Sequence, residues 1–336
     1  MRRVSNPPNP WSHAEIEWIG EPPPAALEVY EERARSVVTG NDSPDLGMPW
    51  SMNPYRGCFH GCAYCFARRS HQYLGFGAGT DFERRIVVKV NAPEVLRREL
   101  GRRGWKGEEI VVSGNTDCYQ PLELSYELTR RCLLVCEEFG NPVAVITKGA
   151  IVRRDADVLA RLAARGLAHV ILSIPFADDA LARAIEPYTS RPSQRFETLR
   201  LLSAAGVPTG ISLAPVIPGL NDSDIPVLLE RAHAAGARTA FMTLVRLAGE
   251  VAPVFEERLR EALPDRADRV LNAIREVRGG ALNDTRFGER LHGRGPRWQA
   301  IEQLYAMHAR RLGFDSGDDP EPLAQPGPAP RQRSLF

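Results

Sequence analysis

The chain has 336 residues, of which 43% are hydrophobic and 25% are charged, and its formal net charge is +1 at pH 7. These values are typical of a soluble globular protein, and they exclude a global charge that would attract nucleic acid or an acidic membrane. No stretch approaches the roughly 20 apolar residues of a membrane-spanning helix, and the first residues lack the apolar core of a signal peptide. We therefore expect a cytoplasmic protein without membrane association, in which clustered cysteines indicate metal binding or catalysis.

Composition divides the chain into four parts. Residues 1–49 are rich in Pro, Asn and Gly and are expected to form an irregular arm that wraps the next domain. Residues 50–250 alternate between strand-like and helical patterns and form the expected core domain. Residues 251–314 contain only helical patterns and form a C-terminal extension, whereas residues 315–336 are rich in Pro, Asp and Gly and are expected to be disordered.

Short β-branched runs recur through the core domain. They are IVVKV (86–90), EIVVSG (109–114), VAVIT (143–147), HVILSI (169–174), TGISLA (209–214) and TAFMTLV (239–245). Their nearly continuous apolar character is typical of strands that are buried on both faces of a parallel sheet. Because helical stretches separate them, the pattern predicts an α/β fold whose βα units close a full or partial TIM-type barrel. A doubly wound sheet is the alternative, although no GxGxxG sequence follows a strand.

The loop RGCFHGCAYCFAR (56–68) contains half of the six cysteines, Cys58, Cys62 and Cys65, in a C-x3-C-x2-C pattern. Structural zinc usually takes four ligands in two separated pairs, and the next cysteine lies far along the chain. A four-iron cluster needs one outer ligand for each iron, so three cysteines leave one iron open for a cofactor or substrate. We therefore predict that these cysteines bind a catalytic 4Fe-4S cluster.

Two other functions remain open for the same loop. His60 could complete a zinc site and make the loop a structural module. A non-catalytic iron-sulfur sensor or electron-transfer protein is the second alternative, although electron carriers normally close all four positions of the cluster.

The cysteine loop, with Arg56-Gly57 before it and Ala67-Arg68 after it, resembles that of the radical S-adenosylmethionine (SAM) superfamily. Five further strings resemble the spore photoproduct lyase branch and its bacterial relatives: NPYRGC, SGNTDCYQPLE, VITKG, IEPYTSRPSQR and APVIPGLND. The resemblance covers about residues 50–250. It implies a partial (β/α)6 barrel, a 4Fe-4S cluster, and SAM bound to the open iron and cleaved to a 5′-deoxyadenosyl radical. It also implies an electron donor such as a flavodoxin or ferredoxin.

The resemblance assigns roles to residues at the ends of the predicted strands. It places Ser113, Gly114, Asn115 and Thr116 beside the amino group of SAM, the backbone of Tyr64 near the adenine, and Ser173 near the ribose. Lys148 is one of only three lysines, and we expect it to contact the SAM carboxylate or ribose, a surface lysine being the alternative.

Two further groups of polar residues allow two interpretations each. Asp117, Tyr119 and Gln120 either line the substrate side or shape a turn. Glu186, Arg191 and Arg195 form either a charge network over the cofactor or surface salt bridges.

Two departures from the spore photoproduct lyase pattern concern hydrogen transfer. Gly114 stands where that enzyme has a hydrogen-donating cysteine, and Phe66 stands where it has a tyrosine. Repair of spore photoproduct is therefore not predicted, and Cys118 and Tyr64 are the candidate catalytic residues. Cys118 could also be an unreactive loop thiol. Together with Cys132 and Cys136 it could hold a second cluster, but the latter two also fit an apolar helix stripe.

Two features suggest a nucleic-acid substrate, which no motif names. Arginines interleave with aromatic residues between residues 286 and 311, as in a phosphate-binding groove or simply on a solvated face. The last five residues, QRSLF (Gln332–Phe336), resemble the bacterial sliding-clamp-binding pentapeptide, although Arg333 departs from its usual leucine. We therefore expect the tail to bind the sliding clamp; a frayed terminus is the alternative.

Overall fold

The computed structural model describes residues 26–316 of the chain. The start of the expected arm and most of the tail lie outside the described part, and so does the clamp-like sequence Gln332–Phe336. Within the described part, no helix is both long and apolar enough to cross a membrane.

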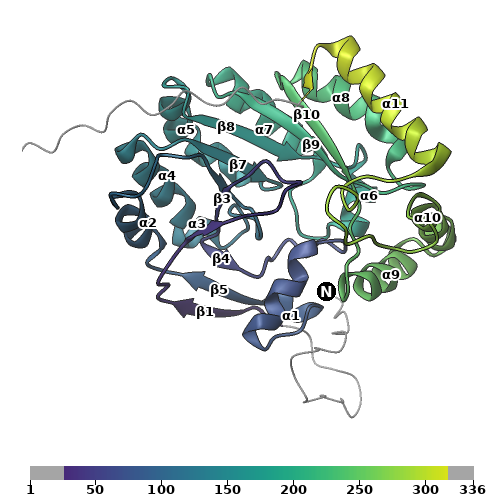
Figure 1. Cartoon of the computed structure of the whole chain (residues 1–336), viewed down its shortest axis with the longest axis horizontal. Coiled ribbons are helices and arrows are strands. Elements are labelled where there is room, and N and C mark those ends of the chain that lie inside the picture. The colour runs from purple at the N-terminus through teal and green to yellow at the C-terminus, as the bar shows by residue number, and fades with distance from the viewer. Residues whose placement is uncertain (1–25, 317–336) are drawn as a thin grey trace, which may run out of the picture.

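The main sheet has eight strands and runs through the centre of the molecule (Figure 1). In spatial order they are β11 (Asp315–Ser316), β10 (Thr239–Leu244), β9 (Thr209–Val216), β8 (Ala168–Ser173), β7 (Val143–Thr147), β6 (Ile110–Val112), β3 (Trp50–Met52) and β2 (Val38–Gly40). Only β2 is antiparallel to its neighbour, so seven strands are parallel. The register places Val112 beside Val145 and Val145 beside Val170, so apolar residues face the helices across several strands.

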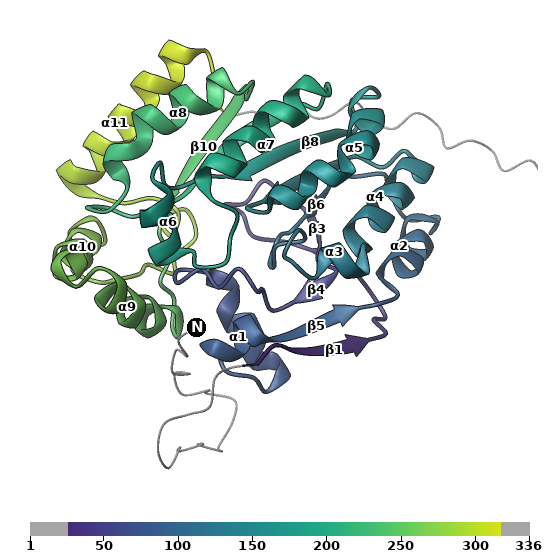
Figure 2. The same ribbon diagram turned by 180° about the vertical axis from the view of Figure 1, so that it is seen from behind.

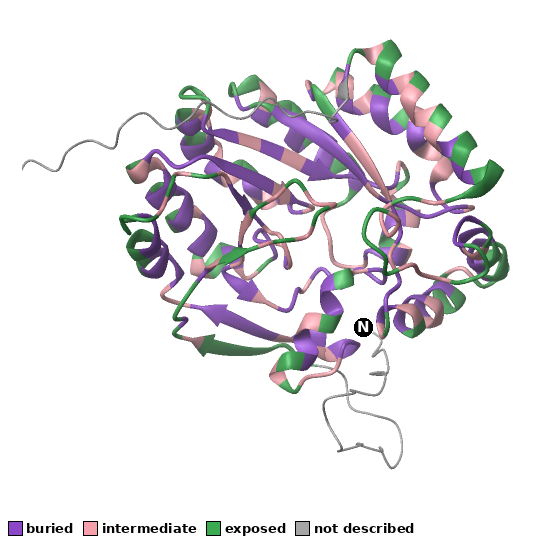
Figure 3. Ribbon diagram, in the orientation of Figure 1, coloured by how far each residue is buried: buried purple, intermediate pink, exposed green. Residues whose placement is uncertain are grey.

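Helices cover the outer face of this sheet, as the α/β pattern predicts (Figure 2). They are α2 (Ala92–Leu100), α4 (Leu128–Phe139), α5 (Ala156–Ala163), α6 (Asp179–Ile185), α7 (Pro192–Ala204) and α8 (Ile225–Ala234), with the shorter η2 (Ala150–Asp155), η3 (Asp222–Asp224) and α3 (Glu123–Tyr126). The strands between them are largely buried (Figure 3). Six adjacent parallel strands, β3 and β6 to β10, alternate with these crossovers, which confirms the partial barrel predicted from the sequence.

One of the apolar runs predicted as barrel strands lies outside the barrel. The apolar run at residues 86–90 forms β5 (Arg85–Lys89), which lies in a separate three-stranded sheet between β1 (Glu28–Glu32) and β4 (Tyr55–Arg56). The first barrel strand is instead β3, whose three residues are too few to give a strand pattern. The arm is also less irregular than expected, because β1 and β2 both fall before residue 50.

The C-terminal extension consists of α9 (Val251–Ala262), α10 (Pro264–Val277) and α11 (Gly295–Leu312). Buried residues of these helices, among them Phe255, Leu271 and Trp298, belong to the same hydrophobic cluster as the barrel strands. The extension therefore shares one core with the barrel. After α11 the chain adds β11 to the edge of β10, so the segment expected to be disordered begins with a short strand.

A loop and the extension together close the gap between the two ends of the barrel. Residues 41–49 lead into β3, and the Asp45 carboxylate lies 2.5 Å from a guanidinium nitrogen of Arg290. The segment that contains Arg290 is fixed in turn to β10, because the backbone N–H of Leu244 donates a hydrogen bond to the Leu291 carbonyl. This ion pair joins the two segments, residues 41–49 and 284–294. Together they form what we call the belt, which lies across the open side of the sheet.

Gly149 allows the end of β7 to pack against the neighbouring loop. A Cβ atom there would lie 2.4 Å from the carbonyl oxygen of Tyr119 and 2.8 Å from its Cβ. We expect Gly149→Ala to lower the free energy of unfolding by about 1–3 kcal/mol, because the overlap is with backbone that cannot move aside easily. Urea denaturation measures this change. Gly104→Ala, where a Cβ meets no atom within 4 Å, is the control, and equal stability of the two variants would contradict the packing.

Candidate functional site

The three predicted cluster cysteines lie on an irregular loop between β4 and the 3-10 helix η1 (Phe66–Leu74). Gly57 and Gly61 adopt left-handed backbone conformations, with φ of 77° and 66°, which allow the tight path of the loop. The Cys58 N–H donates a hydrogen bond to the Phe82 carbonyl. All three cysteines line one cavity.

Two buried arginines hold the carbonyl groups of this loop. Arg68 is fully buried and donates hydrogen bonds to the carbonyls of Gly61 and Cys62 and to the Glu83 carboxylate. It also reaches two carbonyls of the segment before α1 (Thr80–Arg84), those of Ala78 and Gly79. Arg258, from α9, donates to the same Gly61 carbonyl and the same Glu83 carboxylate. Because Glu83 is also buried, it is the counter-charge that both guanidinium groups share.

Gln120 fixes the same loop from the barrel side. Its side-chain oxygen accepts a hydrogen bond from the Phe59 N–H at 2.9 Å, and its amide nitrogen donates to the Gly57 carbonyl at 3.2 Å. The side chain is fully buried. Of the two interpretations that the sequence left open, the structure therefore favours a shaping role for Gln120.

The donor set suits a cluster better than a single metal ion. Burial raises the pKa values of the Cys58, Cys62 and Cys65 thiols, so thiolates in this place require a cationic partner. Among the described residues, no three Cys, His, Asp or Glu side chains converge on one point as a mononuclear site needs. In a cubane each cysteine binds a different iron, so the thiols stand apart around the cluster. Three thiols on one loop meet that requirement.

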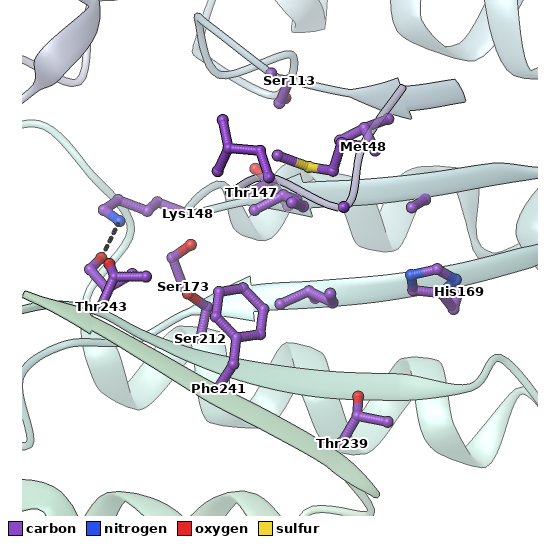
Figure 4. A pocket seen from close by; sticks show the side chains of 18 of the residues that line it. Met48, Ser113, Thr147, Lys148, His169, Ser173, Ser212, Thr239, Phe241 and Thr243 are labelled. Atoms are coloured by element: carbon purple, nitrogen blue, oxygen red, sulfur yellow. Dashed lines mark hydrogen bonds between the residues drawn. The ribbon is translucent and has the colours of Figure 1, made fainter. Parts of the chain in front are cut away.

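The cavity next to the cysteines has a volume of about 2210 Å³ and follows the inner face of the barrel strands. The residues for which the sequence predicted SAM contacts all line it: Tyr64, Ser113, Gly114, Asn115, Thr116, Lys148 and Ser173. In Figure 4, Lys148, Ser173 and Thr243 lie together at one end, whereas His169 and Thr239 lie toward the other. The structure therefore brings the predicted cofactor residues and the cysteines to one cavity.

Lys148 belongs to a buried charge network. Its Nζ lies 3.7 Å from Glu186 Oε1 and 3.4 Å from the Ala214 carbonyl oxygen. The Tyr64 hydroxyl and the Arg195 guanidinium also donate hydrogen bonds to the Glu186 carboxylate. Burial opposes ionisation of Glu186, but the charges of Arg195 and Lys148 hold its pKa below the usual value. The network predicted from IEPYTSRPSQR is thus internal rather than a set of surface salt bridges, although Arg191 stays exposed.

Asp117 joins two neighbouring strand ends. It accepts hydrogen bonds from the Thr147 hydroxyl at 2.6 Å and from the Lys148 backbone N–H at 2.7 Å, and His60 Nδ1 lies 3.3 Å away. Burial alone would raise the pKa of Asp117, but the neighbouring His60 and these hydrogen bonds lower it well below its usual range. A permanently ionised Asp117 therefore fixes the backbone from which the Lys148 side chain projects.

Of the two interpretations of Cys118, its position favours an unreactive thiol. Its side chain is fully buried in the main hydrophobic cluster and does not line the cavity. The backbone is held in this orientation because the Cys118 N–H donates to the Ser113 hydroxyl and the Cys118 carbonyl accepts from the Thr129 hydroxyl. Cys132 and Cys136 are also fully buried in this cluster, as the apolar helix stripe indicated.

Gly114 cannot be replaced by a cysteine without displacing its neighbour. A Cβ atom at this position would lie 2.7 Å from the Cβ of Ser51 and 3.1 Å from its hydroxyl oxygen. The close packing of β3 against the end of β6 therefore leaves no room for a cysteine side chain at Gly114.

Several cavity residues were missed by sequence reasoning. Thr243 and Phe241 lie on one face of β10, and the alternation in TAFMTLV could have identified both. Met48, from the belt, and Arg246, just beyond β10, carried no sequence signal.

The arginines that suggested a phosphate groove are mostly ion-paired: Arg286 with Asp284, Arg290 with Asp45, Arg294 with Glu289, Arg297 with Glu276 and Arg311 with Glu230. This pairing favours the solvated-face interpretation.

Comparison with known proteins places this architecture among related chains. A family model described as the radical SAM superfamily matches residues 52–232. An uncharacterized protein of Mycobacterium tuberculosis is 37% identical over 226 residues, which are 67% of this chain and 66%, less than two thirds, of the relative. An uncharacterized protein of Methanocaldococcus jannaschii is 27% identical over 196 residues, which are 58% of this chain and 70% of the relative.

Solved structures of spore photoproduct lyase share the fold. The enzyme complexed with dinucleoside spore photoproduct is 16% identical, with a TM-score of 0.60 over 85% of this chain and 79% of that chain. A mutant of it with bound AdoMet is 17% identical, with a TM-score of 0.62 over 90% of this chain and 86% of that chain. At these identities the likeness concerns the fold alone.

The shared counter-charge Glu83 gives a direct test of the arginine clamp. We expect Glu83→Gln to lower the free energy of unfolding by about 3–5 kcal/mol, because it leaves two buried guanidinium groups without a negative partner. Chemical denaturation measures the change. The matched control is Glu138→Gln, which removes an exposed ion pair with Arg97 and should cost less than about 1 kcal/mol. Similar losses in both variants would contradict the clamp.

Proposed function

Because the chain belongs to the radical SAM superfamily, we propose that it binds a 4Fe-4S cluster through Cys58, Cys62 and Cys65 and uses SAM to generate a 5′-deoxyadenosyl radical. One observation supports this most: the three cysteines and every residue expected to contact SAM line one cavity. Ser113–Thr116, Lys148 and Ser173 lie at the carboxyl ends of β6, β7 and β8, where barrel enzymes collect their chemistry. When bound, the cluster supplies the electron that cleaves the sulfonium of SAM.

The residues of the cavity are suited to orient SAM. An ammonium group has three N–H donors. That of Lys148 faces the Glu186 carboxylate and the Ala214 carbonyl. The remaining N–H can meet the carboxylate or a ribose hydroxyl of SAM. We assign the Ser173 hydroxyl to the ribose and the polar groups of Ser113–Thr116 to the amino group. Tyr64 is tied to Glu186 through its hydroxyl, which fixes the backbone beside Cys65 for the adenine.

We also propose that the substrate is a nucleic acid or one of its components and that a flavodoxin or ferredoxin supplies the electron. Support for the substrate comes from the fold shared with an enzyme that was solved with a dinucleoside photoproduct. The clamp-like sequence Gln332–Phe336 would bring the enzyme to DNA, but it lies outside the described residues. With Cys118 buried, any hydrogen returned to the substrate would come from another group, and Tyr64 is the candidate that lines the cavity.

Replacing any one of the three loop cysteines by alanine should abolish cluster binding, because each is the only ligand of one iron. Anaerobic reconstitution followed by iron and sulfide analysis and visible absorption measures this loss. Cys132→Ala, which removes a thiol of the hydrophobic core, is the matched control and should retain the cluster. Full iron content in Cys62→Ala would show that the ligands have been assigned wrongly.

The double substitution Lys148→Ala, Ser173→Ala should weaken SAM binding by at least about tenfold, because it removes two hydrogen-bond donors from the proposed site. Calorimetric titration of the anaerobic, cluster-loaded protein measures the dissociation constant. Lys106→Ala is the control, since Lys106 lines the cavity but precedes β6 at the opposite ends of the strands. If the double variant and the control bind SAM equally well, the cofactor lies elsewhere.

A further inference from the structure

Three basic side chains line the cavity near the cysteine loop, and they differ in whether a carboxylate faces them. His60 faces Asp117 at 3.3 Å, and Lys148 faces Glu186 at 3.7 Å. Arg246 has no ion pair with a carboxylate in the described part of the chain, and its buried Nε has no hydrogen-bond partner there. A half-buried guanidinium without an acceptor is costly, so the donors that have no partner among the described residues can serve a ligand.

The neighbours of Arg246 explain why its charge stays uncompensated. Arg69 is paired with Glu250 at 3.1 Å, and Arg290 is paired with Asp45 in the belt. Asp45, the carboxylate whose charge acts on Arg246, thus already serves another arginine. Burial, followed by repulsion from Arg290, lowers the pKa of Arg246. An anion that entered the cavity would relieve both effects.

An aromatic ring stands directly beside this cation. The guanidinium carbon of Arg246 lies 5.7 Å from the centre of the Phe66 ring. Phe66 follows the third cluster cysteine, lines the same cavity, and keeps 49% of its surface exposed. An exposed aromatic face next to a planar cation is a surface on which a flat ring can stack while an attached oxyanion meets the guanidinium fork.

We propose that Arg246 and Phe66 form the substrate-binding part of the cavity and that they take a nucleotide unit, with its phosphate on Arg246 and its base against Phe66. The proposal rests on the function proposed above and narrows its substrate to a ring that carries an oxyanion. Lys148, on β7, serves SAM, whereas Arg246, beyond β10, serves the substrate. The two cations therefore divide the cavity between cofactor and substrate.

The test titrates the cluster-loaded protein with thymidine 5′-monophosphate, thymidine and a thymidine hexanucleotide. We expect Arg246→Gln to weaken binding of the monophosphate at least about tenfold, because a charge-assisted pair is lost. Arg246→Lys, which keeps the charge but not the fork, should lie between Arg246→Gln and the unaltered protein. Phe66→Leu should weaken both the monophosphate and thymidine. Arg97→Gln, at an exposed arginine that pairs with Glu138, is the control and should bind like the unaltered protein.

The hexanucleotide identifies the source of the nucleotide. Binding at least tenfold tighter than that of the monophosphate would indicate a strand, and equal binding would indicate a free nucleotide; both support the proposal provided that Arg246→Gln weakens them. Equal binding by Arg246→Gln and the unaltered protein, or no binding of either phosphate, would overturn it.

SAM affinity and iron content are measured on the same samples. Loss of SAM affinity in Arg246→Gln would also overturn the proposal, because the anion would then be the SAM carboxylate. Failure of the unaltered protein to bind a cluster or SAM would instead refute the proposed function, and the nucleotide titrations would still report on Arg246.

Discussion

The candidate site depends on how the carbonyl groups of the cysteine loop are satisfied. This loop, which has no regular secondary structure, pairs only part of its own backbone, and unpaired buried carbonyls are costly. Arg68 and Arg258 supply the donors for Gly61 and Cys62, and Glu83 neutralises both arginines. These three charged residues come from η1, α9 and α1, so the C-terminal extension is part of the support of the site.

A second set of buried charges organises the strand ends opposite the loop. Asp117 fixes the backbone at the end of β7, and Glu186 gathers Lys148, Tyr64 and Arg195. Lys148 is thereby paired with a carboxylate, whereas Arg246, which also lines the cavity, has no such partner among the described residues. The proposed division between a cofactor side and a substrate side follows from this difference in charge pairing.

Much of this arrangement could be predicted from the sequence, because local patterns carry it. Five of the six barrel strands were found from apolar runs, and the polar residues that follow them converge, as the ends of parallel strands must. The first strand, Trp50–Met52, could not be found, because three residues give no periodicity. The run at residues 86–90 is equally apolar but lies in a second sheet, a difference set by long-range pairing.

The buried positions of Arg68, Glu83 and Arg258 were also beyond prediction, because charged residues are rarely buried without partners that only the fold reveals. The burial of Cys118 was equally beyond prediction, because only the fold shows that the loop after β6 turns its thiol toward the core.

Reductive cleavage of SAM tests the central claim most directly. The reconstituted protein is reduced with dithionite under anaerobic conditions in the presence of SAM, and 5′-deoxyadenosine and methionine are quantified by chromatography. The account predicts release of both products by the unaltered protein and of neither by a variant in which Cys58, Cys62 and Cys65 are alanine. A protein that carries a full complement of iron, becomes reduced, binds SAM and still releases no 5′-deoxyadenosine would contradict it and would indicate an iron-sulfur protein without this chemistry.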